Sequence, residues 1–110
     1  PCSGTGTWRR NPELRWRMTP KRLEHTTELQ QRLIDLGSEM VKPGGRLVYA
    51  VCSLLDAEGG DQAEKFLERH TGWQEKSIDL PIGRPYRKGI LLSPYHDGTD
   101  GFYFTCLEKL

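Results

Sequence analysis

The chain has 110 residues, of which 35% are hydrophobic and 28% charged, with a formal net charge of +1. This length allows one domain with a modest core, and the composition excludes a mainly disordered chain. No segment approaches the roughly 18 consecutive apolar residues that a membrane-spanning helix needs.

The N-terminal segment predicts a loop followed by a basic stretch. The sequence begins PCSGTGTWRR, with neither a starting Met nor an apolar signal segment, so we expect a piece of a longer protein. Residues 1–7 are rich in Gly, Ser and Thr and predict a loop, and residues 8–18 are interrupted by Pro12 and predict irregular structure.

Positive charge is concentrated in residues 8–22, which contain Trp8 and Trp16 and a single acidic residue, Glu13. The basic residues of this cluster are Arg9, Arg10, Arg15, Arg17, Lys21 and Arg22. Basic and aromatic side chains together suit contacts with phosphates and bases of nucleic acid. Composition alone favours a solvated loop and helix face over a nucleic-acid contact, and both interpretations stay open at this point.

Thr19-Pro20 is a helix start, with Thr as the N-cap and Pro at the first helical position, and it predicts a long helix over residues 20–41. Four apolar residues follow at helical spacing and predict the buried stripe of this helix: Leu29, Leu33, Leu36 and Met40. Pro and Gly in residues 42–45 predict a sharp turn.

Residues 46–52 form a continuous apolar run, which predicts a strand buried on both faces. A loop over 53–60 and a second helix over 61–70 follow, the helix carrying Ala63, Phe66, Leu67 and His70 at helical spacing. Alternation over 73–79 predicts a strand near a sheet edge.

The C-terminal third predicts a loop over 80–89, a short strand or extended connection over 90–93, a turn over 94–100 and a final strand over 101–110. A strand, a helix and a further strand indicate a parallel unit, whereas the last two strands are close enough in sequence to be antiparallel. The whole order predicts a mixed α/β sheet with an antiparallel last strand.

The three cysteines, Cys2, Cys52 and Cys106, are odd in number and widely spaced, which indicates a reducing compartment and a cytoplasmic protein rather than a disulfide scaffold. The histidines are scattered, and no spacing fits a zinc site, so we expect no metal.

Two short motifs place cysteines where chemistry is expected: Pro1-Cys2-Ser3-Gly4, and Ala50-Val51-Cys52-Ser53 at the end of the predicted strand. Ligands of open α/β sheets bind beyond the carboxyl ends of strands, and neighbouring strands lie about 4.8 Å apart. If Pro1 also follows a strand, both thiols face one crevice. A free cysteine is also a common small core residue, an alternative that applies to Cys52 and that we adopt for Cys106.

Four segments in this order carry a resemblance: PCSGTG, WRRNPELRW, KPGGRLVYAVCSLLDAEGGDQ and DGTDGFYFTCL. The chain resembles the C-terminal half of the catalytic domain in the RsmB/Sun/Nop family of RNA cytosine-5 methyltransferases. The resemblance runs through nearly all of residues 1–110, with the motif loop and basic segment in 1–18 and the helix–strand–helix–strand–strand half in 19–110.

This resemblance implies the second half of a class I, Rossmann-like methyltransferase fold, with an antiparallel last strand. It implies S-adenosylmethionine as methyl donor and places the glycine-rich cofactor loop upstream of Pro1. We therefore expect the 110 residues alone to be inactive. We also expect them to self-associate, because the strand over 46–52 would have an unpaired side.

The family chemistry implies Cys52 as the nucleophile that attacks carbon 6 of a cytosine, and Cys2 as the thiol that assists product release. The six basic residues of 8–22 would contact the backbone of a ribosomal or transfer RNA. The sequence departs from the family pattern in two places. Val51 replaces a usual Thr, and the segment Glu58-Gly59-Gly60-Asp61 keeps only the first Glu of a usual Glu-Asn-Glu.

Two alternatives to catalysis stay open. One is an RNA-binding remnant of the same fold, which would keep the basic segment and need neither thiol. The other is a redox switch that joins Cys2 and Cys52, because thiols at neighbouring strand ends can meet disulfide geometry.

Overall fold

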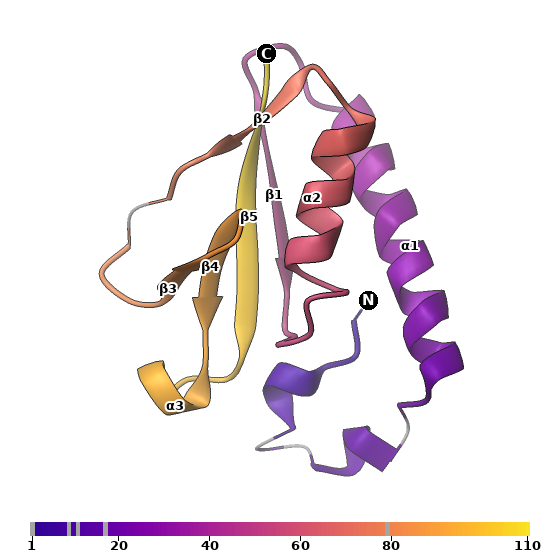
Figure 1. Ribbon diagram of the computed structural model, residues 1–110, viewed down its shortest axis with the longest axis vertical. Helices are drawn as coiled ribbons and strands as arrows, with labels where there is room; N and C mark the ends of the chain where they lie inside the picture. Colours follow the sequence, from indigo (N-terminus) through magenta and orange to yellow (C-terminus); the bar gives the residue numbers. More distant parts are fainter. Residues whose placement is uncertain (1, 9, 11, 17, 79) are drawn as a thin grey trace.

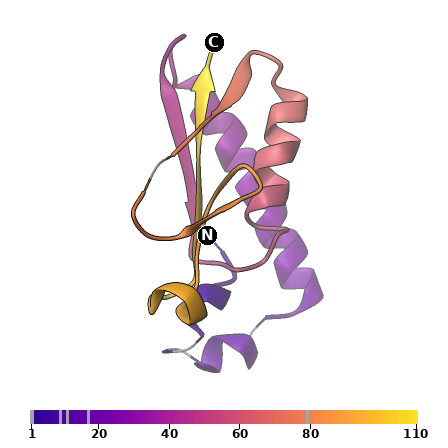
Figure 2. The same ribbon diagram turned by 60° about the vertical axis from the view of Figure 1, so that its left-hand side comes forward.

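The computed structural model describes residues 2–8, 10, 12–16, 18–78 and 80–110, and for residues 14 and 15 it describes the backbone only. Two long helices pack side by side on one face of a five-stranded sheet (Figures 1 and 2). In chain order the elements are η1 (Thr5–Thr7), η2 (Pro12–Trp16), α1 (Pro20–Glu39), β1 (Arg46–Val51), α2 (Gly60–Arg69), β2 (Trp73–Lys76), β3 (Arg84–Tyr86), β4 (Gly89–Leu92), α3 (Pro94–Asp97) and β5 (Phe102–Lys109).

The last strand, β5, organises the sheet. It pairs antiparallel with β1 along one side, and with β2 and β4 along the other, while β3 extends the sheet beyond β4. The predicted α/β fold with an antiparallel last strand is confirmed, but every pair of neighbouring strands in the described residues is antiparallel, so the predicted parallel pairing of the strands over 46–52 and 73–79 does not occur. Because β1 and β2 both run opposite to β5, they run in the same direction, but β5 lies between them and they are not neighbours.

The core lies between α1, α2 and the sheet. Its centre is made by Ile34, Phe66, Trp73 and Leu107, each at most 9% exposed. The ring of Phe66 meets the edge of Trp73 with centroids 5.2 Å apart. The prediction for the second helix is therefore confirmed, since Ala63 and Phe66 are fully buried.

The predicted apolar stripe of α1 is wrong by about one residue around the helix. Leu33 and Leu36 are 45% and 56% exposed, whereas Gln30, Ile34 and Ser38 are buried. Polar side chains are tolerated inside because each has a partner: the Gln30 amide donates to Glu58, and the Ser38 hydroxyl donates to the carbonyl of Asp35. Within the described residues we find no helix apolar and long enough to cross a membrane.

The prediction that the strand over 46–52 is buried on both faces is also wrong. Leu47 and Tyr49 pack against the core, but Val48 on the opposite face is 62% exposed. The helices cover only one face of the sheet, and in the described residues β1 pairs only with β5. The apolar run therefore occupies an edge strand with one uncovered face.

Several short elements depart from the sequence predictions. The predicted loop over 80–89 contains β3, whose Pro85 is accommodated at the sheet edge, where no ladder donor is needed. The predicted turn over 94–100 contains α3, capped by Ser93 and ended by Gly98 at φ +66°. The loop over 1–7 contains η1, and β2 ends at Lys76, three residues before the predicted end.

A glycine contact joins the N-terminal loop to the segment before β5. The amide of Gly101 donates to the carbonyl of Gly6 at 2.7 Å, and the amide of Gly6 donates to the carbonyl of Cys52 at 3.2 Å. A Cβ on Gly6 would lie 1.9 Å from the carbonyl oxygen of Gly101. Only a residue without a side chain lets these backbones approach so closely.

We predict that Gly6→Ala destabilises the protein by about 3 kcal/mol or more, because backbone rather than a movable side chain occupies the space of the new methyl group. Thermal and denaturant unfolding measure the change. Gly72→Ala is the matched control, since a Cβ there meets nothing within 4 Å. Equal stability of the two variants would contradict the close approach.

Candidate active site

The two motif cysteines lie side by side at the carboxyl end of β1. Cys52 directly follows the last residue of the strand, and Cys2 lies in the loop before η1. The Sγ of Cys2 is 3.9 Å from the carbonyl oxygen of Cys52, and both thiols are free and half-buried. This distance confirms that the two cysteines lie near each other, while Pro1 lies outside the described residues.

A buried carboxylate holds the two cysteine loops together. Glu58 is 0% exposed and accepts hydrogen bonds from the amide and the hydroxyl of Ser3, both at 2.6 Å. It also accepts from the hydroxyl of Ser53, and from the amide of Gln30 at 3.3 Å. Each cysteine is thus followed by a serine that is bonded to the same carboxylate.

The loop after Cys52 folds back because its own polar groups satisfy one another. The amide of Leu55 donates to the hydroxyl of Ser53 at 3.1 Å, a local turn typical of serine. The amide of Glu58 then donates to the carbonyl of Leu55 at 3.1 Å. Across the crevice, the hydroxyl of Thr5 accepts from the amide of Leu54 at 2.9 Å. These bonds direct the Glu58 side chain inward, towards both motifs.

An ion pair flanks the thiols. The guanidinium of Arg10 donates to Asp100 at 2.6 Å and so connects the basic segment to the loop before β5. Burial raises the pKa of the Cys52 thiol above its usual value, and the nearby Cys2 and Asp100 raise this pKa further, while Arg10 lowers it. Arg10 and Asp100 therefore act in opposite directions on the ionisation of Cys52.

A cleft of about 510 Å³ opens beside Cys2, between the N-terminal loop and the first turns of α1. Lys21, Arg22 and His25 line it from the helix, and Ser3 and Met18 line it from the adjoining loops. Two of the six predicted RNA-binding residues therefore face the same cleft as a motif thiol. The cleft can admit an anionic or polar ligand next to Cys2.

The remaining predicted RNA-binding residues are placed less uniformly. Arg10 is engaged with Asp100 rather than extended into the cleft. Arg9 and Arg17 lie outside the described residues, and so does the side chain of Arg15. Cys106 is buried in β5, as expected for a core residue. No group of His, Cys, Asp and Glu that could hold a metal ion occurs in the part of the chain that the structure describes.

The sequence prediction of the site omitted Ser3, Ser53, Glu58 and Asp100. A signal for the first three exists, because both motifs contain the dipeptide Cys-Ser and an acidic residue follows the second motif closely. No local pattern joins Asp100 to Arg10, which lies 90 positions earlier in the chain.

An α/β fold with an antiparallel last strand, and two cysteine motifs meeting at the carboxyl end of β1, are the features expected of a Rossmann-like methyltransferase with cysteine motifs. The family described as 16S rRNA methyltransferase RsmB/F matches residues 1–108, and the chain belongs to this family.

Curated relatives of the chain are methyltransferases of the same family. The chain is 41% identical to a probable ribosomal RNA small subunit methyltransferase B of Synechocystis, and 36% identical to the ribosomal RNA small subunit methyltransferase B of Thermus thermophilus. It covers 26% and 28% of these two proteins, while they cover 99% and 100% of the chain. The chain thus spans about a quarter of the length of the relatives it matches.

Among solved structures, the protein PH0851 is 33% identical, with a TM-score of 0.92 over 99% of this chain and 25% of that chain. NSun6 from Pyrococcus horikoshii, determined with the S-adenosylmethionine analogue SFG, is 29% identical, with a TM-score of 0.83 over 99% of this chain and 28% of that one. The expected Rossmann-like methyltransferase fold is confirmed.

We predict that Asp100→Asn accelerates alkylation of Cys52 by iodoacetamide at neutral pH by roughly two- to tenfold. Loss of the carboxylate removes a negative charge and leaves Arg10 unopposed, so the thiol pKa falls and the reactive thiolate fraction rises. Arg10→Ala should slow alkylation for the opposite reason. Peptide mass spectrometry across a pH series measures both effects.

Asp35→Asn is the matched control, because Asp35 is bonded to Arg69 in a comparable ion pair away from the two motifs. Faster alkylation in this control, or slower alkylation in Asp100→Asn, would contradict the electrostatic assignment.

Proposed function

We propose that the chain is part of an S-adenosylmethionine-dependent RNA methyltransferase that modifies carbon 5 of cytosine, in ribosomal or transfer RNA. The observation that carries the proposal is the pair of thiols brought together at the end of β1 and held there by Glu58. Family membership supports a methyltransferase, and the two cysteine motifs support the choice of cytosine.

In this proposal Cys52 is the nucleophile. Its thiolate adds to carbon 6 of the cytosine, and the electrons of the carbon 5–carbon 6 double bond shift to make carbon 5 nucleophilic. Because the pKa of Cys52 is raised, its thiol must lose a proton as the cytosine binds, and Arg10 favours the resulting thiolate. The half-buried position of this thiol limits its contact with water.

Cys2 is proposed to assist release of the product. After methylation, a base removes the proton at carbon 5, the double bond re-forms and the Cys52 sulfur leaves carbon 6. The Cys2 thiol lies 3.9 Å from the carbonyl of Cys52, so a group of suitable chemistry is next to this step. The network from Ser3 through Glu58 to Ser53 keeps the two loops in register while the bonds change.

The basic cleft is proposed to receive the RNA. Lys21 and Arg22 lie in the first turn of α1 and face the cleft beside Cys2. Phosphate contacts from such residues position a strand without reading its sequence. Arg9, Arg10, Arg15 and Arg17 remain proposed contacts of the same kind, Arg10 in addition to its pairing with Asp100.

S-adenosylmethionine would supply the methyl group. The two glycines of the turn between β1 and α2 leave no open space for it, because a Cβ at Gly59 would lie 2.9 Å from Tyr103 and one at Gly60 would lie 2.7 Å from Arg87. The resemblance places the cofactor loop upstream of Pro1. We therefore propose that the 110-residue chain alone binds the donor too weakly for turnover.

The two alternatives predict different behaviour. An RNA-binding remnant would bind RNA without forming a covalent adduct. A redox switch would form a disulfide between Cys2 and Cys52, which a mass difference with and without reductant reveals.

RNA that contains 5-azacytidine distinguishes these functions, because it traps the carbon 6 adduct. In the full-length protein we predict a covalent complex that Cys52→Ala abolishes, a loss of at least about a hundredfold. Cys2→Ala should still form the adduct with ordinary RNA but release it slowly, so that the complex accumulates. Denaturing electrophoresis and peptide mapping measure both.

Cys106→Ala is the control, since this thiol is buried in β5. Equal capture by Cys52→Ala and the unaltered protein would refute the nucleophile assignment. Tight RNA binding without any adduct would favour the remnant.

For the 110-residue chain by itself we also propose self-association through β1. Its unpaired edge and the neighbouring face of α1 line an apolar groove of about 240 Å³ that includes Leu33, Leu47 and Val48. The strand has no charge after Arg46 and no proline to discourage pairing. A second copy can add its own β1 to this edge.

We predict dimers or larger species at micromolar concentration in sedimentation velocity. Val48→Lys should shift the population towards monomer, because an inserted charge blunts an edge strand. Tyr95→Lys is the control, as this residue is 91% exposed on α3. A monomer of 12.6 kDa in the unaltered chain would refute the proposal.

A further inference from the structure

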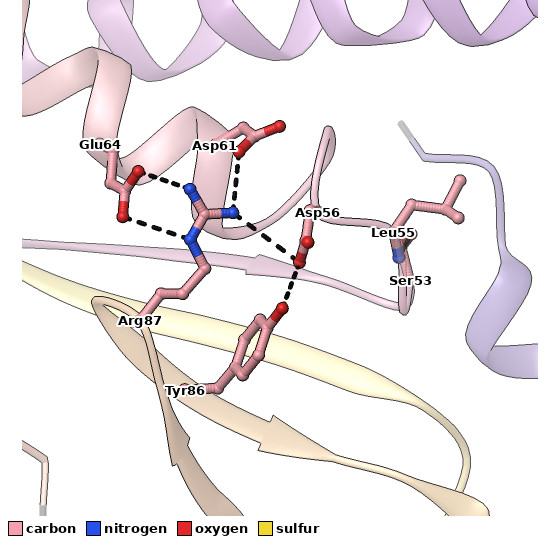
Figure 3. Close-up of polar contacts among 7 residues, drawn as sticks. All are labelled: Ser53, Leu55, Asp56, Asp61, Glu64, Tyr86 and Arg87. Atoms are coloured by element: carbon pink, nitrogen blue, oxygen red, sulfur yellow. Dashed lines mark hydrogen bonds and ion pairs between the residues drawn. The ribbon is translucent and has the colours of Figure 1, made fainter.

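The tip of the β3–β4 hairpin contacts the turn that follows Cys52 and the start of α2. At this tip, the Arg87 guanidinium donates to Glu64 through two nitrogens, at 3.2 and 2.5 Å, and lies 2.8 Å from Asp61 (Figure 3). The same group lies 3.8 Å from Asp56. The neighbouring Tyr86 hydroxyl donates to Asp56 at 2.8 Å.

These contacts act on the part of the chain that places Glu58. Asp56 lies within the turn between Cys52 and Glu58, and its carbonyl accepts from the amides of Gly59 and Asp61 at 3.1 and 2.9 Å. Asp61 and Glu64 lie in the first two turns of α2. The hairpin tip therefore bridges the turn and the helix start that together hold Glu58 inward.

The Arg87 ion pairs have a geometry in which a surface ion pair contributes measurably to stability. Isolated exposed pairs contribute little, but a bidentate arginine in a network of several carboxylates is the exception. The Arg87 side chain is only 24% exposed, less than any of its three acidic partners.

The backbone of Arg87 supports the same interpretation. Its φ is +52°, the only positive value for a non-glycine residue in the part of the chain that the structure describes. Arg87 is the first of the two residues that connect β3 to β4, a position where positive φ normally selects glycine. An arginine occupies this position although the conformation costs energy, which indicates that its side chain has a role.

Gly60 completes the arrangement. A Cβ at this position would come within 2.7 to 2.9 Å of three atoms of the Arg87 side chain. Gly60 belongs to the segment Glu58-Gly59-Gly60-Asp61, where the sequence departs from the family pattern. The glycine at 60 and the arginine at 87 thus fit one another sterically.

We propose that Arg87, whose side chain packs against Gly60, is a positioning residue. It fixes the turn over 53–60 and, through Glu58 in this turn, the alignment of Cys52. This inference rests on the proposed function for its catalytic consequence, but the positioning itself can be measured separately. Arg87 does not touch the thiols and acts only through the turn.

The test compares three variants of the full-length protein: Arg87→Ala, Arg87→Lys and Gly60→Ala. Arg84→Ala, on the same hairpin, is the matched control. Amide hydrogen exchange at Gly59 and Asp61 should accelerate about five- to thirtyfold in Arg87→Ala. Arg87→Lys keeps the charge but cannot bridge three carboxylates, so it should restore the protection only in part. Gly60→Ala should act in the same direction as Arg87→Ala, because it displaces the guanidinium.

The catalytic consequence is a fall in kcat with little change in KM for RNA, accompanied by a changed alkylation rate of Cys52. If Arg87→Ala fails to fold, Gly60→Ala and Arg87→Lys give the same readouts. Exchange and alkylation rates equal to those of Arg84→Ala would overturn the proposal, as would a fall in kcat without faster exchange in the 53–60 turn.

The two proposals fail separately. If the unaltered protein forms no adduct with RNA, the proposed function fails, and the exchange rates still decide the role of Arg87.

Discussion

The arrangement of the site depends on one buried carboxylate. Glu58 is removed from solvent, and burial of an ionisable oxygen pair is costly unless hydrogen bonds replace the lost water. Ser3 and Ser53 supply three of these bonds from the two cysteine loops. The carboxylate is therefore satisfied only when both loops are in place, which couples the position of Cys2 to that of Cys52.

The site is also a product of close backbone packing. Three segments that are distant in sequence meet at the carboxyl end of β1: the N-terminal loop, the turn after Cys52 and the loop before β5. Gly6 and Gly101 let two of them touch without side chains between. The ion pair of Arg10 with Asp100 then adds a charged contact across the same junction. Rigid placement of this kind suits chemistry that needs two thiols in a defined relation.

The two faces of the sheet differ in helix coverage, and the two edges of β1 differ in strand pairing. Helices α1 and α2 cover one face, while the face with Val48 is open (Figure 2). The side of β1 that faces away from β5 is unpaired in the described residues. The same apolar run is thus compatible with a buried central strand in a larger sheet and with self-association in the chain alone.

The sequence by itself determined the types of the longer elements and the two cysteine motifs, because helical caps, apolar periodicity and motif spacing are local properties. It predicted α2, β5 and the proximity of Cys2 to Cys52, and it left the segment of β4 open between a short strand and an extended connection. It failed for the buried face of α1, since the leucine stripe and the polar Gln30 and Ser38 compete for the core, and only the partners of those polar groups decide the outcome.

Only the tertiary structure showed that Glu58 joins both loops, that Arg10 pairs with Asp100, and that Arg87 seats on Gly60. The last two contacts join residues that no local pattern relates, and Arg10 lies 90 positions from its partner. Arg87 adopts a backbone conformation that its residue type disfavours. Such contacts follow from how the sheet and helices assemble, because folding brings charged and polar groups together across distances in the chain that periodicity does not encode.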